Sequence, residues 1–169
     1  NRNPYLSITE IEEFLSSYYG VDQVLWLGDG IVGDDTDGHI DDITRFVNKN
    51  TVITVVEENK QDENYEPLQQ NLKTLKGMRL LDGQQINIIE IPMPAPVVYE
   101  DQRLPASYAN FYIANNRVIV PTFRDKNDHR ALMLIQQAFP GYEIIGIDSL
   151  DIIWGLGSFH CLSQQEPSV

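Results

Sequence analysis

The chain has 169 residues, of which 42% are hydrophobic and 22% charged, and this balance is typical of one globular domain over residues 1–169. A net charge of −13 repels phosphate groups and anionic lipid headgroups, so we expect no nucleic-acid partner and no membrane partner. The single cysteine excludes an internal disulfide and favours a reducing compartment, here the cytoplasm. The acidic balance is also compatible with a cationic substrate.

The first third of the chain predicts a helix, a strand, an acidic loop and a second helix. A capping box begins at Ser7, and apolar residues then recur at helical spacing until Gly20 ends the helix. Residues 24–27 form an apolar run of strand length, and residues 28–37 are rich in glycine and aspartate, as loops are. Apolar residues at helical spacing predict a short helix over 40–47.

Strands and helices then alternate to the end of the chain, which predicts a mixed α/β fold. Asn115-Asn116 is a suitable two-residue hairpin turn between strands at 111–113 and 117–120, because asparagine tolerates positive φ. The other predicted elements are a strand over 51–56, a helix over 66–76, a strand over 86–91, an irregular proline-rich connection over 92–96, a helix over 128–139 and a strand over 142–147.

Six residues between Asp34 and Asp42 are acidic or histidine. A solvated loop that caps a helix accounts for such a segment without any ligand, because acidic residues favour helix N-termini. A calcium loop of the EF-hand type does not fit, since it would need an acid at Gly33 and a glutamate at Thr44. Zinc fits poorly because the three histidines are scattered and there is one cysteine. We expect no metal and no cofactor.

His39 and Asp41 remain as a pair with chemical potential in this acidic segment. If Ile40 points away, both side chains face one cavity. Histidine is the usual proton carrier near neutral pH, and a carboxylate is a natural acceptor for a planar cation. The spacing is common by chance, so it supports a site only together with other residues.

Cys161 is the second candidate for chemistry. A lone cysteine is usually an inert, buried hydrophobic residue. This one follows a glycine-containing bend, Gly155-Leu-Gly157, and has polar neighbours, which is compatible with an exposed sulfur. A protonated His39 or a bound guanidinium would favour the reactive thiolate. We expect His160 to be structural, because adjacent residues of an extended segment face opposite ways.

Five segments, in this order, resemble signature segments of the agmatine deiminase and bacterial peptidylarginine deiminase family. They span nearly the whole chain, and five matches in order are more specific than any single one. The segments are Asn1-Arg-Asn-Pro4, Gly33-Asp-Asp-Thr-Asp-Gly-His-Ile-Asp41, Arg103-Leu-Pro-Ala-Ser-Tyr-Ala-Asn-Phe-Tyr-Ile113, Val118-Ile-Val-Pro121 and His160-Cys-Leu-Ser-Gln-Gln165.

The resemblance implies the pentein fold, a five-bladed α/β propeller of ββαβ units, of which this chain holds roughly half. It implies that Cys161 is the covalent nucleophile and His39 the general acid–base residue. Asp41 then binds the guanidinium nitrogens, and Asp35 is a substrate-binding acid toward the amine tail. The implied reaction converts agmatine, a small cation, to N-carbamoylputrescine and ammonia through a thiouronium intermediate on Cys161, without a cofactor. Deimination of peptidyl-arginine, or a non-catalytic fragment or binding module, is the alternative.

The sequence departs from the family pattern at two places beside the expected site. The family usually has a glycine run and an asparagine before the His-Cys pair, where this chain has Gly155-Leu-Gly157-Ser158. Asp42 stands where asparagine is more usual. The resemblance also implies that the N-terminal half of the family's chain, with further substrate-binding acids, is absent. Because a half-propeller exposes strand edges and apolar surface, we expect association with the missing half or a homo-oligomer.

Overall fold

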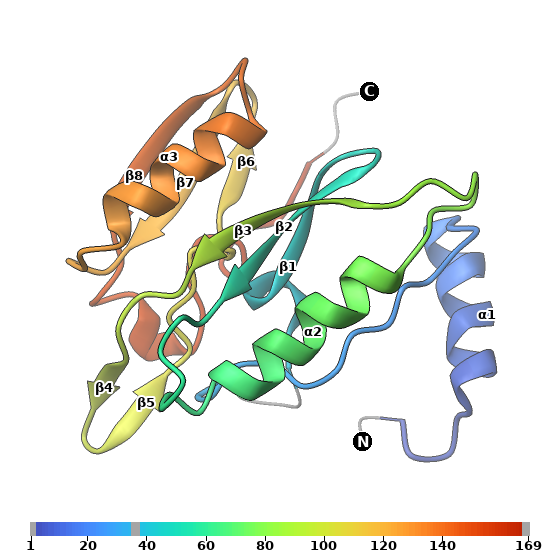
Figure 1. Cartoon of the computed structure of the whole chain (residues 1–169), viewed down its shortest axis with the longest axis horizontal. Coiled ribbons are helices and arrows are strands. Elements are labelled where there is room, and N and C mark those ends of the chain that lie inside the picture. The colour runs from blue at the N-terminus through green and yellow to red at the C-terminus, as the bar shows by residue number, and fades with distance from the viewer. Residues whose placement is uncertain (1–2, 35–37, 167–169) are drawn as a thin grey trace.

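The computed structural model describes residues 3–34 and 38–166, and two segments of the chain repeat one arrangement (Figure 1). In each repeat, two antiparallel strands are followed by a helix and by a third strand that runs parallel to the second. The first unit consists of β1 (Thr44–Asn48), β2 (Thr51–Val56), α2 (Tyr65–Gly77) and β3 (Asn87–Pro92). The second unit consists of β6 (Tyr112–Ala114), β7 (Arg117–Thr122), α3 (Asp128–Ala138) and β8 (Glu143–Asp148). The structure is thus mixed α/β, as the sequence predicts.

The second strand of each unit is the central one of its sheet, in the orders β1-β2-β3 and β6-β7-β8. All of β2 after Thr51 is buried, which explains why its sequence, TVITVV, is apolar and β-branched without alternation. Helix α2 packs against β2, whereas α3 contacts both its own strand β8 and β3 of the first unit. Helix α3 therefore joins the two units (Figure 1).

One hydrophobic core runs through both units and through the segment that connects them. Residues 104–111, just before β6, are all buried, and Tyr108 and Phe111 are among the largest fully buried side chains. The core also takes Val55 from β2 and Val120 from β7. The connecting segment is consequently held on all sides, and it carries Asn110 into the interior.

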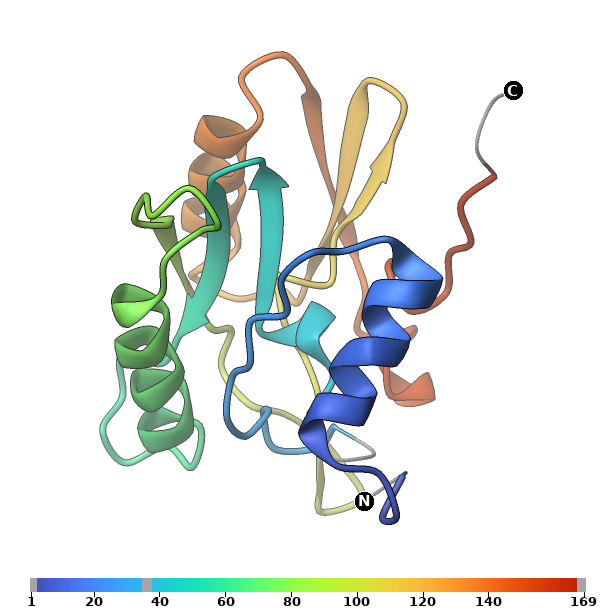
Figure 2. The ribbon, with the colours of Figure 1, turned by 90° about the vertical axis from the view of Figure 1, so that its right-hand side faces the viewer.

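Helix α1 (Ile8–Tyr19) stands apart from these two units (Figure 1), and it faces the viewer when the molecule is turned by 90° (Figure 2). Its capping box between Ser7 and Glu10 is present, and Gly20 ends it with φ of 67°, as predicted. None of its residues is buried, although its sequence is amphipathic. Exposed aromatic side chains, including Phe14, Tyr18 and Tyr19, lie along it.

Two sequence predictions are wrong in the first third of the chain. The helix predicted over 40–47 is a single 3-10 turn, η1 (Ile40–Asp42), followed by strand β1. Pairing with β2 decides this, since Thr44, Arg45 and Phe46 lie opposite Thr54, Ile53 and Val52. The strand predicted over 24–27 carries no strand assignment, because no described segment pairs with it.

The remaining predicted elements are confirmed within one or two residues, including the Asn115-Asn116 hairpin, in which Asn115 has φ of 54°. The sequence analysis missed one hairpin, formed by β4 (Val97–Tyr99) and β5 (Gln102–Leu104) around Glu100 and Asp101, both at positive φ. A second 3-10 turn, η2 (Ile153–Gly155), precedes Cys161. None of the helices in the described part of the chain combines the length and apolar character needed to cross a bilayer.

Candidate active site

Two loops from opposite ends of the chain meet at the buried amide of Asn110. The Nδ2 atom of Asn110 donates to Asp41 Oδ2 at 3.0 Å and to Asp42 Oδ1 at 2.9 Å, both from η1. The same atom lies 3.0 Å from the sulfur of Cys161, which follows η2. The connecting segment between the two ββαβ units thus brings Asp41 and Cys161 together.

The amide oxygen of Asn110 holds the cysteine loop in place. It accepts from the backbone N–H groups of Ser158, His160 and Cys161 at 3.1–3.3 Å, and from the Ser158 hydroxyl at 2.9 Å. Because backbone N–H groups only donate, these contacts determine which end of the Asn110 amide is oxygen and which is nitrogen. Every hydrogen of Asn110 Nδ2 is therefore directed at the side chains of the site.

Cys161 is exposed, as the sequence analysis expects, and its thiol donates to Asp41 Oδ2 at 3.3 Å. Burial of the sulfur raises the pKa of Cys161 to about 11; the hydrogen bond from Asn110 lowers it, while the negative charge of Asp41 raises it further. At neutral pH the thiol is therefore protonated in the ligand-free protein. A cation placed beside Asp41 would offset that carboxylate's effect on the sulfur.

His160 lies in the site, contrary to the expectation that it is only structural. Its Nδ1 is 2.7 Å from Asp41 Oδ2. Residues 159–162 form turns rather than an extended strand, so His160 and its neighbour Cys161 both reach Asp41. Burial raises the pKa of Asp41, but hydrogen bonds from His160 and Cys161 outweigh burial and leave that pKa below its ordinary value. Asp41 is thus a carboxylate at neutral pH.

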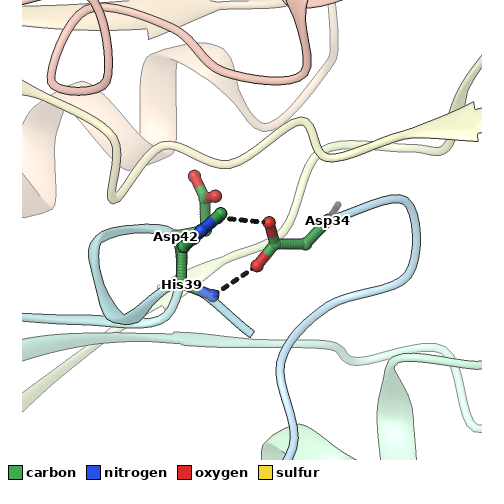
Figure 3. A group of neighbouring side chains, drawn as sticks. All are labelled: Asp34, His39 and Asp42. Atoms are coloured by element: carbon green, nitrogen blue, oxygen red, sulfur yellow. Dashed lines mark hydrogen bonds and ion pairs between the residues drawn. The ribbon is translucent and has the colours of Figure 1, made fainter. Parts of the chain in front are cut away.

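His39 is held by Asp34 rather than by Asp41. The His39 ring nitrogen Nδ1 is 2.6 Å from Asp34 Oδ1, and Asp34 Oδ2 accepts a short hydrogen bond from the backbone N–H of His39 (Figure 3). The Asp34 side chain is 1% exposed and that of His39 is 37% exposed. Such a carboxylate fixes the orientation of the imidazole and favours a proton on Nδ1.

Asp34 lies in a loop whose two ends, at Gly30 and Gly38, are in contact because neither glycine has a side chain. A Cβ atom on Gly30 would overlap the backbone of Gly38, and a Cβ atom on Gly38 would lie 2.7 Å from the nitrogen of Gly30. The loop therefore closes on itself and returns Asp34 to a position beside His39. Asp35, the fourth residue of the expected site, lies outside the described residues.

Arg45, from β1, supports the connecting segment on both sides of Asn110. Its Nη1 donates to the carbonyl oxygens of Ala109 at 3.1 Å and Phe111 at 2.9 Å, and its guanidinium carbon lies 4.7 Å from the centroid of the Phe111 ring. A half-buried arginine is satisfied by such carbonyl and aromatic contacts. It also places one positive charge near the acidic side chains of η1.

In the described part of the chain, two groups of three side chains could each hold an ion, because the possible ligand atoms within each group lie within 4.8 Å of one another. They are Asp34, His39 and Asp42, and Asp41, Asp42 and Cys161. The hydrogen bonds from His39 to Asp34, from Asn110 to Asp42 and from Cys161 to Asp41 already account for this closeness. We therefore assign no metal ligand to this site.

The sequence analysis missed Asn110, Asp34 and Arg45. Asn110 was quoted only as part of a matched segment, Arg103 to Ile113, and Asp34 only as one acid among several. A polar residue inside an otherwise buried run, Ala-Ser-Tyr-Ala-Asn-Phe, is the signal that would have pointed to Asn110, because a buried amide needs partners. No pattern in the sequence links it to Cys161, 51 residues later.

Comparison with known proteins identifies close relatives of the chain. An agmatine deiminase from Pseudomonas fluorescens is 34% identical over 99% of this chain and 50% of its own length. The solved structure of an agmatine deiminase from Enterococcus faecalis matches with a TM-score of 0.92 and 34% identity, over 98% of this chain and 50% of that one. A C. jejuni agmatine deiminase, a cysteine-to-serine variant solved with substrate bound, matches with a TM-score of 0.85 and 40% identity, over 94% of this chain and 46% of that one.

The chain spans about half the length of the relatives that it matches, and it shares the pentein fold of these deiminases. A family model also covers residues 1–167, almost the entire sequence. The chain therefore belongs to the family of Porphyromonas-type peptidyl-arginine deiminases.

Proposed function

We propose that the protein hydrolyses the guanidinium group of agmatine to N-carbamoylputrescine and ammonia, with Cys161 as nucleophile. The observation that carries this proposal is the contact between a thiol and an ionised carboxylate, Cys161 Sγ and Asp41 Oδ2, 3.3 Å apart in an exposed position. The relatives named agmatine deiminases, among them the substrate-bound C. jejuni variant, support this choice of substrate.

Asp41 suits the binding of a guanidinium. Its contacts with the side chains of Asn110, His160 and Cys161 all end on Oδ2. Oδ1 takes no part in these three contacts, so it is the oxygen that a substrate nitrogen would use. A cation docked there lies beside the sulfur and stabilises the thiolate that Asp41 alone disfavours. Substrate binding would thereby activate the nucleophile.

The reaction proceeds in two steps. When the substrate binds, the Cys161 thiol loses its proton to solvent. The thiolate then forms a bond to the guanidinium carbon, the bond from that carbon to one terminal nitrogen breaks, and His39 supplies the proton with which ammonia departs. A thiouronium is left on Cys161. Water then adds to its carbon as His39 takes a proton, and the carbon–sulfur bond breaks to release the ureido product and the thiol. Asp34 holds the His39 ring for both transfers.

We also propose that the chain represents the C-terminal half of a five-bladed propeller, because the relatives are about twice as long. The other half would supply further acids for the substrate, so we expect the 169 residues by themselves to be inactive. Asp35 would bind the amine end of agmatine, an assignment that rests on the family resemblance. We propose a cytoplasmic location, because a reducing compartment keeps a lone thiol free.

Peptidyl-arginine is the alternative substrate, and the description of the matched family favours it. Both substrates present a guanidinium to the same sulfur, so they differ only in what lies beyond the alkyl chain. A non-catalytic binding module is the third alternative.

The test is an assay of ammonia and ureido-product release from agmatine and from an arginine peptide. It uses the longest reading frame that contains this chain, beside its Cys161→Ser variant and with equal unfolding midpoints as a control for folding. Turnover of agmatine that Cys161→Ser abolishes supports the proposal, and turnover of the peptide alone supports the alternative. A folded protein that turns over neither is a binding module.

A further inference from the structure

Asp42 is buried beside the site but has no role in the chemistry proposed above. It is 1% exposed, and its Oδ1 accepts from Asn110 Nδ2 at 2.9 Å. Its other oxygen, Oδ2, is inaccessible and has no hydrogen-bond partner among the described residues. An ionised carboxylate would leave that oxygen without water and without a donor, which is costly, whereas a neutral acid carries much less charge there.

The charges around Asp42 also favour its neutral form. Burial raises the pKa of Asp42 to about 8, and the negative charges of Asp41 and Asp34 contribute, while Asn110 and Arg45 act in the opposite direction. Below that pH the side chain keeps its proton. Five titratable groups face Asp42 from the elements around it. They are Asp41 from η1, Asp34 and His39 from the preceding loop, Arg45 from β1 and Cys161 from the cysteine loop.

The protonation state of Asp42 matters because three acceptors compete for one amide. Asn110 Nδ2 has two hydrogens but lies within 3.0 Å of Asp41 Oδ2, Asp42 Oδ1 and Cys161 Sγ. A neutral acid is the weakest oxygen acceptor of this set, and an ionised one is about as strong as Asp41. Ionisation of Asp42 would draw the amide away from the sulfur and place a second negative charge near it.

We propose that Asp42 is a positioning residue that acts through Asn110, and that it must hold its proton for Asp41 and Cys161 to share the Asn110 amide. The protonated carboxylic acid then resembles a neutral amide at this position, because it carries no net charge. Loss of the proton to solvent, with no other change in bonding, weakens the hydrogen bond to Cys161 and disfavours its thiolate. This role rests on the proposed function, since it concerns the nucleophile of that reaction, but its test needs no substrate.

The experiment measures alkylation of the chain by iodoacetamide as a function of pH from 6 to 10. Because Cys161 is the single cysteine, the rate reports this thiol alone. The variant is Asp42→Asn, which is neutral at every pH, and the matched control is Asp82→Asn, which removes one charge from an exposed turn. Both variants are compared with the parent at equal ionic strength.

We expect Asp42→Asn to react roughly three- to tenfold faster than the parent at pH 9, as a thiol pKa lower by about half a unit to one unit requires. The ratio of the two rates should fall toward one at pH 6, where Asp42 of the parent is neutral. A loss of packing alone would change the ratio equally at all pH values. Asp82→Asn should follow the parent throughout.

A second measurement keeps the outcome independent of how well the variant folds. In the parent protein, carbon NMR of aspartate carboxyl groups should show one group with a midpoint near 8 that is missing from Asp42→Asn. A constant rate ratio, or the absence of any aspartate titrating above pH 6, overturns the role of Asp42. Failure of the protein to deiminate agmatine would leave both results unchanged, so it is distinguishable from failure of this proposal.

Discussion

Asp41 combines two effects on Cys161 that act in opposite directions. Its negative charge and its hydrogen bond both favour the neutral thiol, and partial burial of the sulfur acts in the same direction. The same charge would attract a guanidinium to the sulfur. Of the two activating charges that the sequence analysis considers, a protonated His39 or a bound guanidinium, we therefore propose the guanidinium.

Replacing Asp41 with asparagine should separate these two effects. In Asp41→Asn we expect the pKa of Cys161 to fall, so that iodoacetamide alkylation at pH 8 becomes roughly three- to tenfold faster. Deimination by the longest reading frame should fall by roughly 100-fold or more, since a stabilising charge at the reacting group is lost. Faster alkylation together with undiminished turnover would contradict the role of Asp41 in substrate binding.

Asn110 is the residue on which the geometry of the site depends most. Removing its side chain leaves the backbone N–H groups of Ser158 and Cys161 without their acceptor. The Ser158 hydroxyl and the His160 N–H then keep only the backbone carbonyl oxygen of residue 110. We expect Asn110→Ala to lower the free energy of unfolding by roughly 3 kcal/mol, measured by urea denaturation. Asn116→Ala, in the exposed hairpin turn, should change it by less than about 0.5 kcal/mol. Equal effects of the two variants would mean that Asn110 is not the anchor of this loop.

At the scale of elements, the loop between η2 and Cys161 depends on a close approach at Gly157. A Cβ atom at this position would lie 2.6 Å from Cys161 Cβ and 2.9 Å from its sulfur, both too close for any side chain. The bend therefore determines where the sulfur lies. At Gly155, in contrast, an added Cβ atom would meet nothing within 4 Å.

This difference between two glycines of one loop predicts different outcomes for the same substitution. Gly157→Ala should displace Cys161 and reduce deimination by the longest reading frame at least tenfold, because the added Cβ atom would overlap Cys161. Gly155→Ala should retain turnover close to that of the parent. Full activity of Gly157→Ala would show that the position of the sulfur is not critical, and loss in both variants would point to a general need for flexibility.

For the whole molecule, the N-terminal side differs in its elements from the two ββαβ units. The two ββαβ units each contain a strand pair, a helix and a parallel strand. Helix α1 is followed by segment 21–27, which pairs with no strand among the described residues. An apolar hollow lies between α1 and β1, lined by Leu15, Tyr19, Leu25 and Phe46, among others. We propose that α1 and this segment belong to a third unit of the same kind. The double length of the relatives agrees with this arrangement.

Hydrogen exchange should test whether α1 belongs to such a third unit. In the 169-residue chain we expect the amides of α1 to exchange much faster than those of α2, because α1 buries no residue and α2 buries Leu68, Leu72 and Leu75. In the longest reading frame, protection of α1 should rise toward that of α2. Protection of α1 in the short chain that equals that of α2 would indicate that something else, such as a second copy, already covers it.

Much of this fold follows from local patterns in the sequence. The strand over 51–56 is predicted because it is uniformly apolar and β-branched, and the hairpin at Asn115-Asn116 because asparagine accepts positive φ. The helices at 65–77 and 128–138 follow from apolar spacing. The segment 40–47 is mispredicted because its apolar spacing fits a helix, while its structure depends on pairing with β2, a contact that local spacing does not encode.

The mixed α/β character and the resemblance to guanidine-modifying deiminases follow from residue type and order along the chain, and the same information selects Cys161, His39 and Asp41 as candidates for the site. Tertiary structure alone decided that Asn110 joins Asp41 to Cys161, that Asp34 holds His39, and that His160 enters the site. The pKa values of Cys161 and Asp42 likewise arise only there. The physical reason is that burial, charge proximity and hydrogen-bond sharing depend on distances between residues far apart in sequence, which exist only once the two ββαβ units have packed around the connecting segment.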